Sequence, residues 1–181
     1  MSIETVNTRL AIEGLEEISE STYEDIIQKK ILELESIIGV DLNPRNRKQY
    51  THKFKGEIYQ LNFYPVQKIS SIKINNTPLE DYFLNEESGI IYLDHTIYGK
   101  VLVNYTTCIS QDEFEHYFKG LLTDMVIYQI LSDESDVDGV VSSLREGDVS
   151  VGYDVSNSLG NRIWTRISEL KDKYSTRIQV I

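Results

Sequence analysis

The spacing of apolar residues changes twice along the chain, and this change limits the folds that the chain can adopt. Between residues 21 and 39, and again after residue 110, apolar residues recur every three or four positions, which predicts helices with one buried face. Between residues 49 and 109 they recur every second position, which predicts strands. Because short strands need a sheet partner or a helix to pack on, the pattern indicates a β region inserted into a helical core.

The fold class predicted from this pattern is α+β. We expect an antiparallel helical core formed by residues 1–43 and 111–181, and a small antiparallel β insertion at residues 44–110. At 181 residues the chain is long enough to bury most of its apolar surface. It is therefore one domain, or a core with one inserted subdomain.

The helical regions predict a short helix at residues 3–10 and three long helices. The first long helix begins after Ser21 or Thr22, which can cap it, and ends at Gly39. The second begins at Ser110, with Glu113 at capping-box spacing. The residues that follow helical spacing in the three helices are Tyr23, Ile26, Ile27, Ile31, Leu34, Ile37 and Ile38; then Phe114, Phe118, Leu121, Leu122, Met125, Tyr128 and Gln129; then Leu159, Ile163, Ile167, Leu170 and Tyr174.

The β insertion is expected to contain at least four short antiparallel strands. Residues 60–63 and 68–74 form two candidate strands, and the second is followed by Asn75 and Asn76, which tolerate the positive φ of a tight turn. Residues 89–93 and 100–105 form two more, which we expect to be separated by a turn at Tyr98 and Gly99.

Two segments near the C-terminus do not fit the helical pattern. Residues 142–154 end in short alternation after a charged turn-like stretch, which predicts a projecting β-hairpin. Residues 175–181 are β-prone, but they have too few neighbours in the sequence to form a core. We therefore expect an extended C-terminal arm that meets a partner.

The net charge of −11 is unevenly distributed. Residues 1–43 carry three basic and ten acidic side chains, and residues 111–141 carry one and eight. Residues 44–110 carry eight basic and six acidic side chains, and residues 142–181 carry six and five. Because affinity for a phosphate backbone comes mostly from Lys and Arg, the acidic helices disfavour a protein that grips DNA. A solvated surface that keeps the chain soluble would explain the same acids.

Neither the length of the apolar runs nor the start of the chain indicates a membrane or secreted protein. No run approaches the ~18 apolar residues of a membrane span. The start lacks the basic and apolar regions of a signal peptide, and Cys108 is the single cysteine. We therefore expect no membrane partner and a reducing compartment, with Cys108 as a small buried apolar side chain.

The sequence contains no pattern that predicts catalysis, a cofactor or a metal. Glu134, Asp136 and Asp138 fall near the ligand positions of a calcium-binding EF-hand loop, but Arg145 occupies the position that needs a bidentate carboxylate. The three histidines are far apart, and none has a companion at metal-ligand spacing. No nucleophile elbow, P-loop or dinucleotide fingerprint occurs. We expect a protein that is not an enzyme.

Taken in order, these elements resemble the head–tail connector family of tailed phages, the portal adaptor or head-completion proteins. The stretches that carry the resemblance are STYEDII at 21–27, IIGVDL at 37–42, PVQKISSI at 65–72, SGIIYL at 88–93, GKVLVNY at 99–105 and SLREGDVSV at 143–151. The resemblance covers nearly the whole chain. It rests on the order of the elements, since none of these stretches is a catalytic signature.

The resemblance implies a structural virion protein. Such proteins form a homo-oligomeric ring of about twelve copies beneath the portal protein. The ring extends the DNA channel and is the platform for a stopper or tail-completion protein. It would be located in the virion neck, after assembly in the host cytoplasm. DNA would pass without specific binding, because acidic helix faces turned toward the channel repel it.

Two sets of residues are the candidate sites under this resemblance. The portal contact is expected on the basic C-terminal segment and its apolar tail: Arg162, Trp164, Arg166, Lys171, Lys173, Tyr174, Arg177, Ile178, Val180 and Ile181. The hairpin is expected to reach a neighbouring subunit or the next ring: Arg145, Glu146, Asp148, Val149, Val151 and Tyr153. Each set also has a simpler interpretation, in which the hairpin covers its own core, the basic helix pairs with acidic helices of the same subunit, and the tail is frayed.

The alternative from another class is a soluble protein- or ligand-binding module that uses the β insertion. A stable monomer with a ligand-dependent melting shift would favour that module. A hydrolase with dispersed catalytic residues is a third and weaker interpretation.

Overall fold

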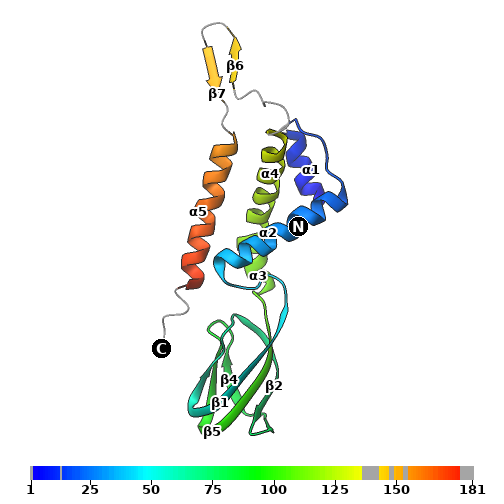
Figure 1. Ribbon diagram of the computed structural model, residues 1–181. Coiled ribbons are helices and arrows are strands. Elements are labelled where there is room, and N and C mark those ends of the chain that lie inside the picture. The colour runs from blue at the N-terminus through cyan, green and yellow to red at the C-terminus, as the bar shows by residue number, and fades with distance from the viewer. Residues whose placement is uncertain (1, 13, 136–142, 147–148, 153–154, 176–181) are drawn as a thin grey trace. The chain divides into compact units, whose positions relative to one another are not determined.

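The computed structural model describes residues 2–12, 14–135, 143–146, 149–152 and 155–175. The chain divides into two compact units, which are described separately. The helical unit comprises residues 1–37 and 115–171, and the β unit comprises residues 38–114 with the end of the last helix from Asp172. Figure 1 shows helices together with an antiparallel sheet, which confirms the predicted α+β class.

The helical unit contains four helices. Their bounds are α1 Ile3–Ile12, α2 Glu20–Ile38, α4 Lys119–Ser135 and α5 Val155–Ser175; α3 Gln111–Glu113 and a π-helical turn at Phe114–Phe118 lead into α4. The predicted stripe of α5 is confirmed, because Leu159, Ile163, Ile167, Leu170 and Tyr174 are all buried. Helix α2 buries most of its predicted face, with Leu34 fully enclosed and Ile26 and Ile37 partly buried.

Helix α4 is buried on every side over residues 121–127, which the single predicted stripe did not show. Every residue from Leu121 to Ile127 is buried, including Thr123 and Asp124. A helix that is buried on every side lies at the centre of its unit, and α1 packs directly against α4. The buried surface of α4 is therefore wider than the predicted stripe, of which Phe114 is only partly buried and Tyr128 is exposed.

The predicted cap at Ser110 is present. The side-chain oxygen of Ser110 accepts a hydrogen bond from the Glu113 backbone N–H at 3.2 Å. Replacing Ser110 with alanine is expected to lower the free energy of unfolding by about 1 kcal/mol, because one N–H at the helix start loses its partner. Urea titration would measure the change. Replacement of the exposed Ser168 in the middle of α5 is the control, and an equal loss there would contradict a capping role.

The β unit contains two long strands and three short ones. Their bounds are β1 Arg45–Gln60, β2 Val66–Ile74, β3 Thr77–Leu79, β4 Tyr82–Asn85 and β5 Ile90–Thr107. All neighbouring strands are antiparallel, in the order β1-β5-β2-β3, and β4 also pairs with β5. The predicted turn at Asn75 and Asn76 is confirmed, since both have positive φ, 50° and 72°.

The prediction of a strand at 60–63 was wrong, because β1 ends at Gln60 and no strand follows until Val66. The prediction of two strands at 89–93 and 100–105 was also wrong. Both segments belong to the single strand β5, which continues through Tyr98 and Gly99 while paired with β1. Gly99 has a φ of 131°, which other residues rarely adopt, so the strand bends at this glycine without ending. A glycine inside alternating residues thus marked a bend rather than a hairpin turn.

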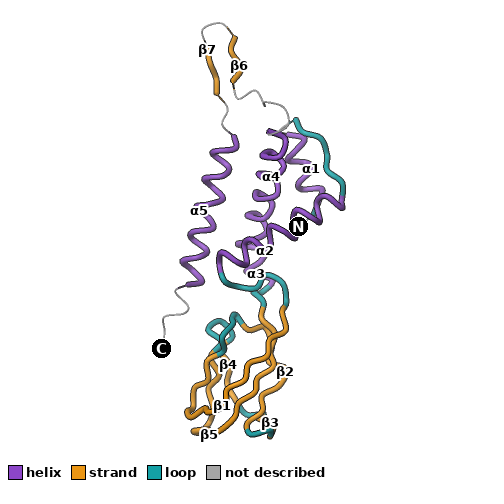
Figure 2. The backbone as a smooth tube through the Cα atoms, in the orientation of Figure 1, coloured by secondary structure: helices purple, strands orange, loops and turns teal. Residues whose placement is uncertain are grey.

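The sheet folds over on itself, because β1 and β5 bend together. Two contacts across the bend of β1 show this: the Gln49 side-chain amide donates to the Gln60 carbonyl at 2.9 Å, and the Thr51 and Tyr59 hydroxyls are 2.8 Å apart. We call the half that contains β2 and β3 the β2 layer, and the half that contains β4 the β4 layer (Figure 2).

One apolar core lies between the two layers. It is formed by Tyr59, Leu61, Val66, Ile72, Ile91, Val101, Val103 and Tyr105. Burial raises the pKa of the Tyr105 hydroxyl above the usual tyrosine value. The protonated hydroxyl donates a hydrogen bond to Gln49 Oε1 at 3.4 Å. The side chains that alternate with the core residues point away from it, on the two sides of the β unit.

Strands β6 Ser143–Glu146 and β7 Val149–Gly152 pair antiparallel, with Leu144 opposite Val151. They lie within the segment predicted as a hairpin. The rest of that segment, including its expected turn, lies outside the described residues, as does the tail from residue 176.

Candidate assembly surfaces

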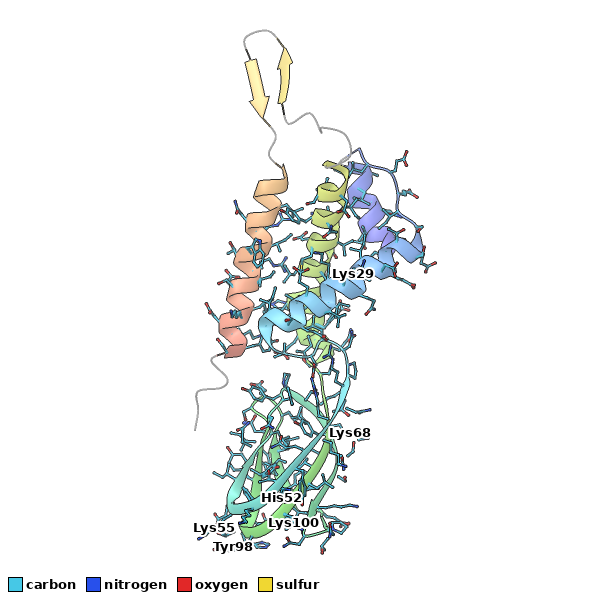
Figure 3. The ribbon with its side chains drawn as sticks, viewed as in Figure 1. Lys29, His52, Lys55, Lys68, Tyr98 and Lys100 are labelled. Carbon is cyan, nitrogen blue, oxygen red and sulfur yellow. The ribbon has the colours of Figure 1, made fainter. Side chains whose placement is uncertain are left out.

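The outer face of the β2 layer is basic. Strand pairing places three rows of side chains across β1, β5 and β2: Tyr50, Leu102 and Lys73; Lys48, Asn104 and Ser71; Asn46, Thr106 and Lys68. Hydrogen bonds within the rows confirm the shared face, since Asn104 donates to Ser71 at 2.9 Å and Thr106 to Asn46 at 3.0 Å. We call the exposed Lys48, Lys68, Lys73 and Lys100 the basic face; Figure 3 labels Lys68 and Lys100.

The charges of residues 44–110 are segregated between the two halves of the sheet. All eight basic side chains lie within residues 45–56, 66–74 and 99–107, and these segments contain no acid. All six acidic side chains lie elsewhere: Glu57, Glu80, Asp81, Glu86, Glu87 and Asp94. Strand pairing brings the three basic segments together, so the β unit has a basic side and an acidic side.

The outer face of the β4 layer carries an exposed apolar row. Ile58, Tyr92 and Phe83 lie directly opposite one another on β1, β5 and β4. They are 55%, 39% and 67% exposed, and the Phe83 and Tyr92 rings are 5.9 Å apart. Asp94, two residues along β5, and Asp81, just before β4, border this row. Exposed apolar patches with a polar border are typical of protein interaction sites.

Sequence reasoning missed both faces of the β unit. The absence of acids from residues 45–56, 66–74 and 99–107 was visible in the sequence, but its meaning depended on which strands pair. The apolar row joins residues from three strands. One of these strands, β4, had not been predicted, so the sequence did not show that Phe83 is exposed beside Tyr92.

Two arginines of the β unit are held by Asp41 and do not contribute to the basic face. The buried Asp41 carboxylate accepts two hydrogen bonds from Arg47 Nη2, at 2.8 and 2.9 Å, and one from the Thr107 hydroxyl. Arg45 Nε lies 3.3 Å from the same carboxylate. This cluster ties the start of β1 to the end of β5.

A second buried carboxylate, Asp124 of α4, organises the helical unit. Arg9 of α1 donates to Asp124 Oδ1 at 2.5 Å, while Arg162 and Arg166 of α5 lie 3.2 and 3.6 Å from Oδ2. Arg166 also donates to the Tyr117 carbonyl at 3.5 Å. The Asp124 side chain is only 7% exposed, so these arginines supply the counter-charge that a buried carboxylate needs.

The residues predicted to contact a portal divide into three groups. Arg162 and Arg166 pair with Asp124, and the end of α5 is anchored at Glu113, which lies 3.5 Å from Lys173 Nζ and 3.2 Å from the Tyr174 hydroxyl. Trp164, 60% exposed, and Lys171 face solvent. The third group lies outside the described residues: Arg177, Ile178, Val180 and Ile181.

The residues predicted for the hairpin fall on β6 and β7 or next to them. Arg145 and Glu146 pair with Ser150 and Val149, and Val151 with Leu144. Asp148 and Tyr153 lie outside the described residues. The structure shows backbone pairing here.

The described residues contain no group of three or more His, Cys, Asp and Glu side chains that could hold a metal ion. His52, His95 and His116 are exposed. Cys108 is buried, with Sγ 3.3 Å from the Leu42 carbonyl, as expected for a small structural side chain. None of the helices described is both long and apolar enough to span a lipid bilayer.

Comparison with solved structures gives an informative likeness. No protein-family model matches the chain, and no curated protein does. Among solved structures, the fold is similar to a chain in "Neck of empty GTA particle computed with C6 symmetry", where GTA is a phage-like gene transfer agent. The TM-score is 0.55 at 13% identity, and the match covers 90% of this chain and 88% of that chain. At this identity the likeness shows a shared fold.

Proposed function

We propose that this chain is a structural protein of a phage or phage-like neck, a head–tail connector that forms a ring beneath the portal. The ring extends the DNA channel and offers a platform for a stopper or tail-completion protein. The observation that carries the proposal is the fold likeness to a neck chain over nine-tenths of the sequence. The order of sequence elements pointed independently to the same class of protein.

The symmetry of the similar neck supports a ring of several copies. That neck was computed with C6 symmetry, and a ring of about twelve copies is compatible with a sixfold axis. The surfaces of the β unit support the same role, because an exposed row of Ile58, Tyr92 and Phe83 serves a protein that meets other proteins. The net charge of −11 supports DNA passing through without being held.

The portal contact is proposed on α5 and the tail that follows it. Trp164 and Lys171 are exposed there, and tryptophan is enriched among residues that dominate binding energy. We predict that removing residues 175–181 leaves a folded protein that no longer joins portal rings. Negative-stain microscopy of the truncated chain mixed with its portal tests this, with circular dichroism as the check on folding.

Two full-length variants sharpen the test of the tail. Ile178→Asp places a charge in the apolar tail and is expected to weaken portal binding at least about tenfold. Gln179→Ala is the matched control and is expected to bind normally. Binding of the truncated chain to portal rings would contradict the tail contact, and a full-length chain that stays solitary beside its portal would contradict the connector function.

A protein-binding module is the second candidate. The row of Ile58, Tyr92 and Phe83 favours it, because this row fits a protein surface without requiring a ring. A stable monomer that binds one protein with a stoichiometry of one, and that forms no ring with a portal, would favour this alternative.

A further inference from the structure

We infer that the β units of neighbouring copies stack head to tail, with the basic face of one copy against the apolar row and bordering acids of the next. This inference rests on the proposed function in one respect, that copies of the chain meet in a ring. It names the surfaces through which they meet. The occupant of each face is a second copy of this chain.

Charge complementarity is the first argument. Lys48, Lys68, Lys73 and Lys100 are exposed, and none of them forms an ion pair with another of the described residues. The opposite layer presents exposed Asp81 and Asp94 beside the apolar row. With a net charge of −11, two copies repel unless a local contact of opposite charge brings them together. The basic face offers that contact.

The directions of the two faces are the second argument. Core residues from both layers form one cluster, so the basic face and the apolar row point away from that cluster on its two sides. A contact between two different faces is heterologous, and repetition of a heterologous contact produces a ring when the rotation closes. A ring subunit needs two such complementary faces, and the β unit has them.

The apolar content of the faces is the third argument. Ile58, Tyr92 and Phe83 are exposed as a continuous row, while the basic face contains exposed Tyr50 and the partly buried Leu102 between its lysines. Lysine side chains can lie along apolar surface with their aliphatic stems while the ammonium group reaches a carboxylate. Stacking would therefore bury the row and pair Asp81 and Asp94 at the same time.

DNA is the competing occupant of the basic face. Four lysines can contact phosphates, but the negative charge of the whole chain opposes approach of a polyanion. DNA binding would need only the lysines of the basic face. Stacking also needs the acids beside the apolar row, which the β unit carries. We therefore favour a second copy.

A charge-swap experiment on the full chain tests the stacking. Sedimentation velocity is expected to show association weakened at least about tenfold for Lys48→Glu/Lys73→Glu, and equally for Asp81→Lys/Asp94→Lys, because each places like charges together. Mixing the two variants is expected to restore association. The chain with all four substitutions is expected to associate with itself but not with the unmodified chain. Glu24→Lys/Lys29→Glu on α2 is the matched control and should change nothing.

Cysteine cross-linking tests the same contact without relying on affinity. An equimolar mixture of Tyr50→Cys and Phe83→Cys chains is expected to form disulfide-linked dimers. A chain that carries both substitutions is expected to form a series of disulfide-linked oligomers. Buried Cys108 gives a low background. Absence of the mixed dimer in concentrated solution and in portal-bound rings would overturn the inference.

The outcomes separate this inference from the proposed function. Portal rings that form normally with both charge-reversed variants would remove the stacking and leave the connector function standing. A chain that stacks through these faces but never joins a portal would support the stacking and contradict the connector function. Salt-sensitive binding of duplex DNA, lost in Lys48→Glu/Lys73→Glu while association is unchanged, would assign the basic face to DNA and overturn the inference.

Discussion

Replacing Asp124 with alanine is expected to lower the free energy of unfolding of the helical unit by about 2–3 kcal/mol. The Asp124 carboxylate accepts from Arg9 and lies within ion-pair distance of Arg162 and Arg166, so three helices share one buried anion. Removing a buried partner leaves its counter-charges uncompensated. The three arginines are 34–53% exposed and can regain water, which keeps the expected loss below that of a fully buried pair.

Trp164 gives a direct measurement of this change. It is the single tryptophan and lies on α5, so its fluorescence during urea unfolding reports on the helical unit. Glu115→Gln is the matched control, because Glu115 and Lys119 form an exposed pair at 2.7 Å, which is expected to contribute under about 0.5 kcal/mol. Equal losses in the two variants would show that Asp124 is not the organising charge.

Replacing Gly99 with alanine is expected to destabilise the β unit by about 2–3 kcal/mol, since two penalties coincide. The first is the φ of 131°, which disfavours any side chain. The second is space, because an added Cβ would lie 2.1 Å from Asn75 Oδ1. Asn75 bonds the Tyr98 carbonyl at 3.0 Å and the Lys100 N–H at 2.9 Å, so the substitution also disturbs the contact between the β2–β3 turn and β5.

Hydrogen exchange at the Lys100 amide measures how Gly99→Ala changes local opening of β5. Urea unfolding measures how it changes the free energy of unfolding. Gly56→Ala is the matched control, because its added Cβ would meet no heavy atom closer than 3.4 Å and its φ is not positive. Adding Asn75→Gly to Gly99→Ala is expected to restore the part of the stability lost through the clash with the Asn75 side chain. The part lost through the φ of residue 99 is expected to remain. A Gly99→Ala protein as stable as Gly56→Ala would contradict the bend in β5.

Local signals in the sequence predicted local structure well. The stripes of α2 and α5, the Ser110 cap and the positive φ of Asn75 and Asn76 all depend on residues close together in the chain. The bend at Gly99 was misread as a turn, because a glycine in alternating sequence is compatible with both and only the pairing of β5 with β1 distinguishes them.

The sequence by itself determined which regions are mainly helical and which mainly extended, and which face α2 and α5 bury, because the periods of 3.6 and 2 are properties of the local backbone. The tertiary structure alone decided that Arg9, Asp124, Arg162 and Arg166 meet, and that Ile58, Tyr92 and Phe83 form one row. It also decided that the three basic segments share one side of the β unit. These features join residues far apart in the chain, and the free energy that brings them together comes from burying a common core.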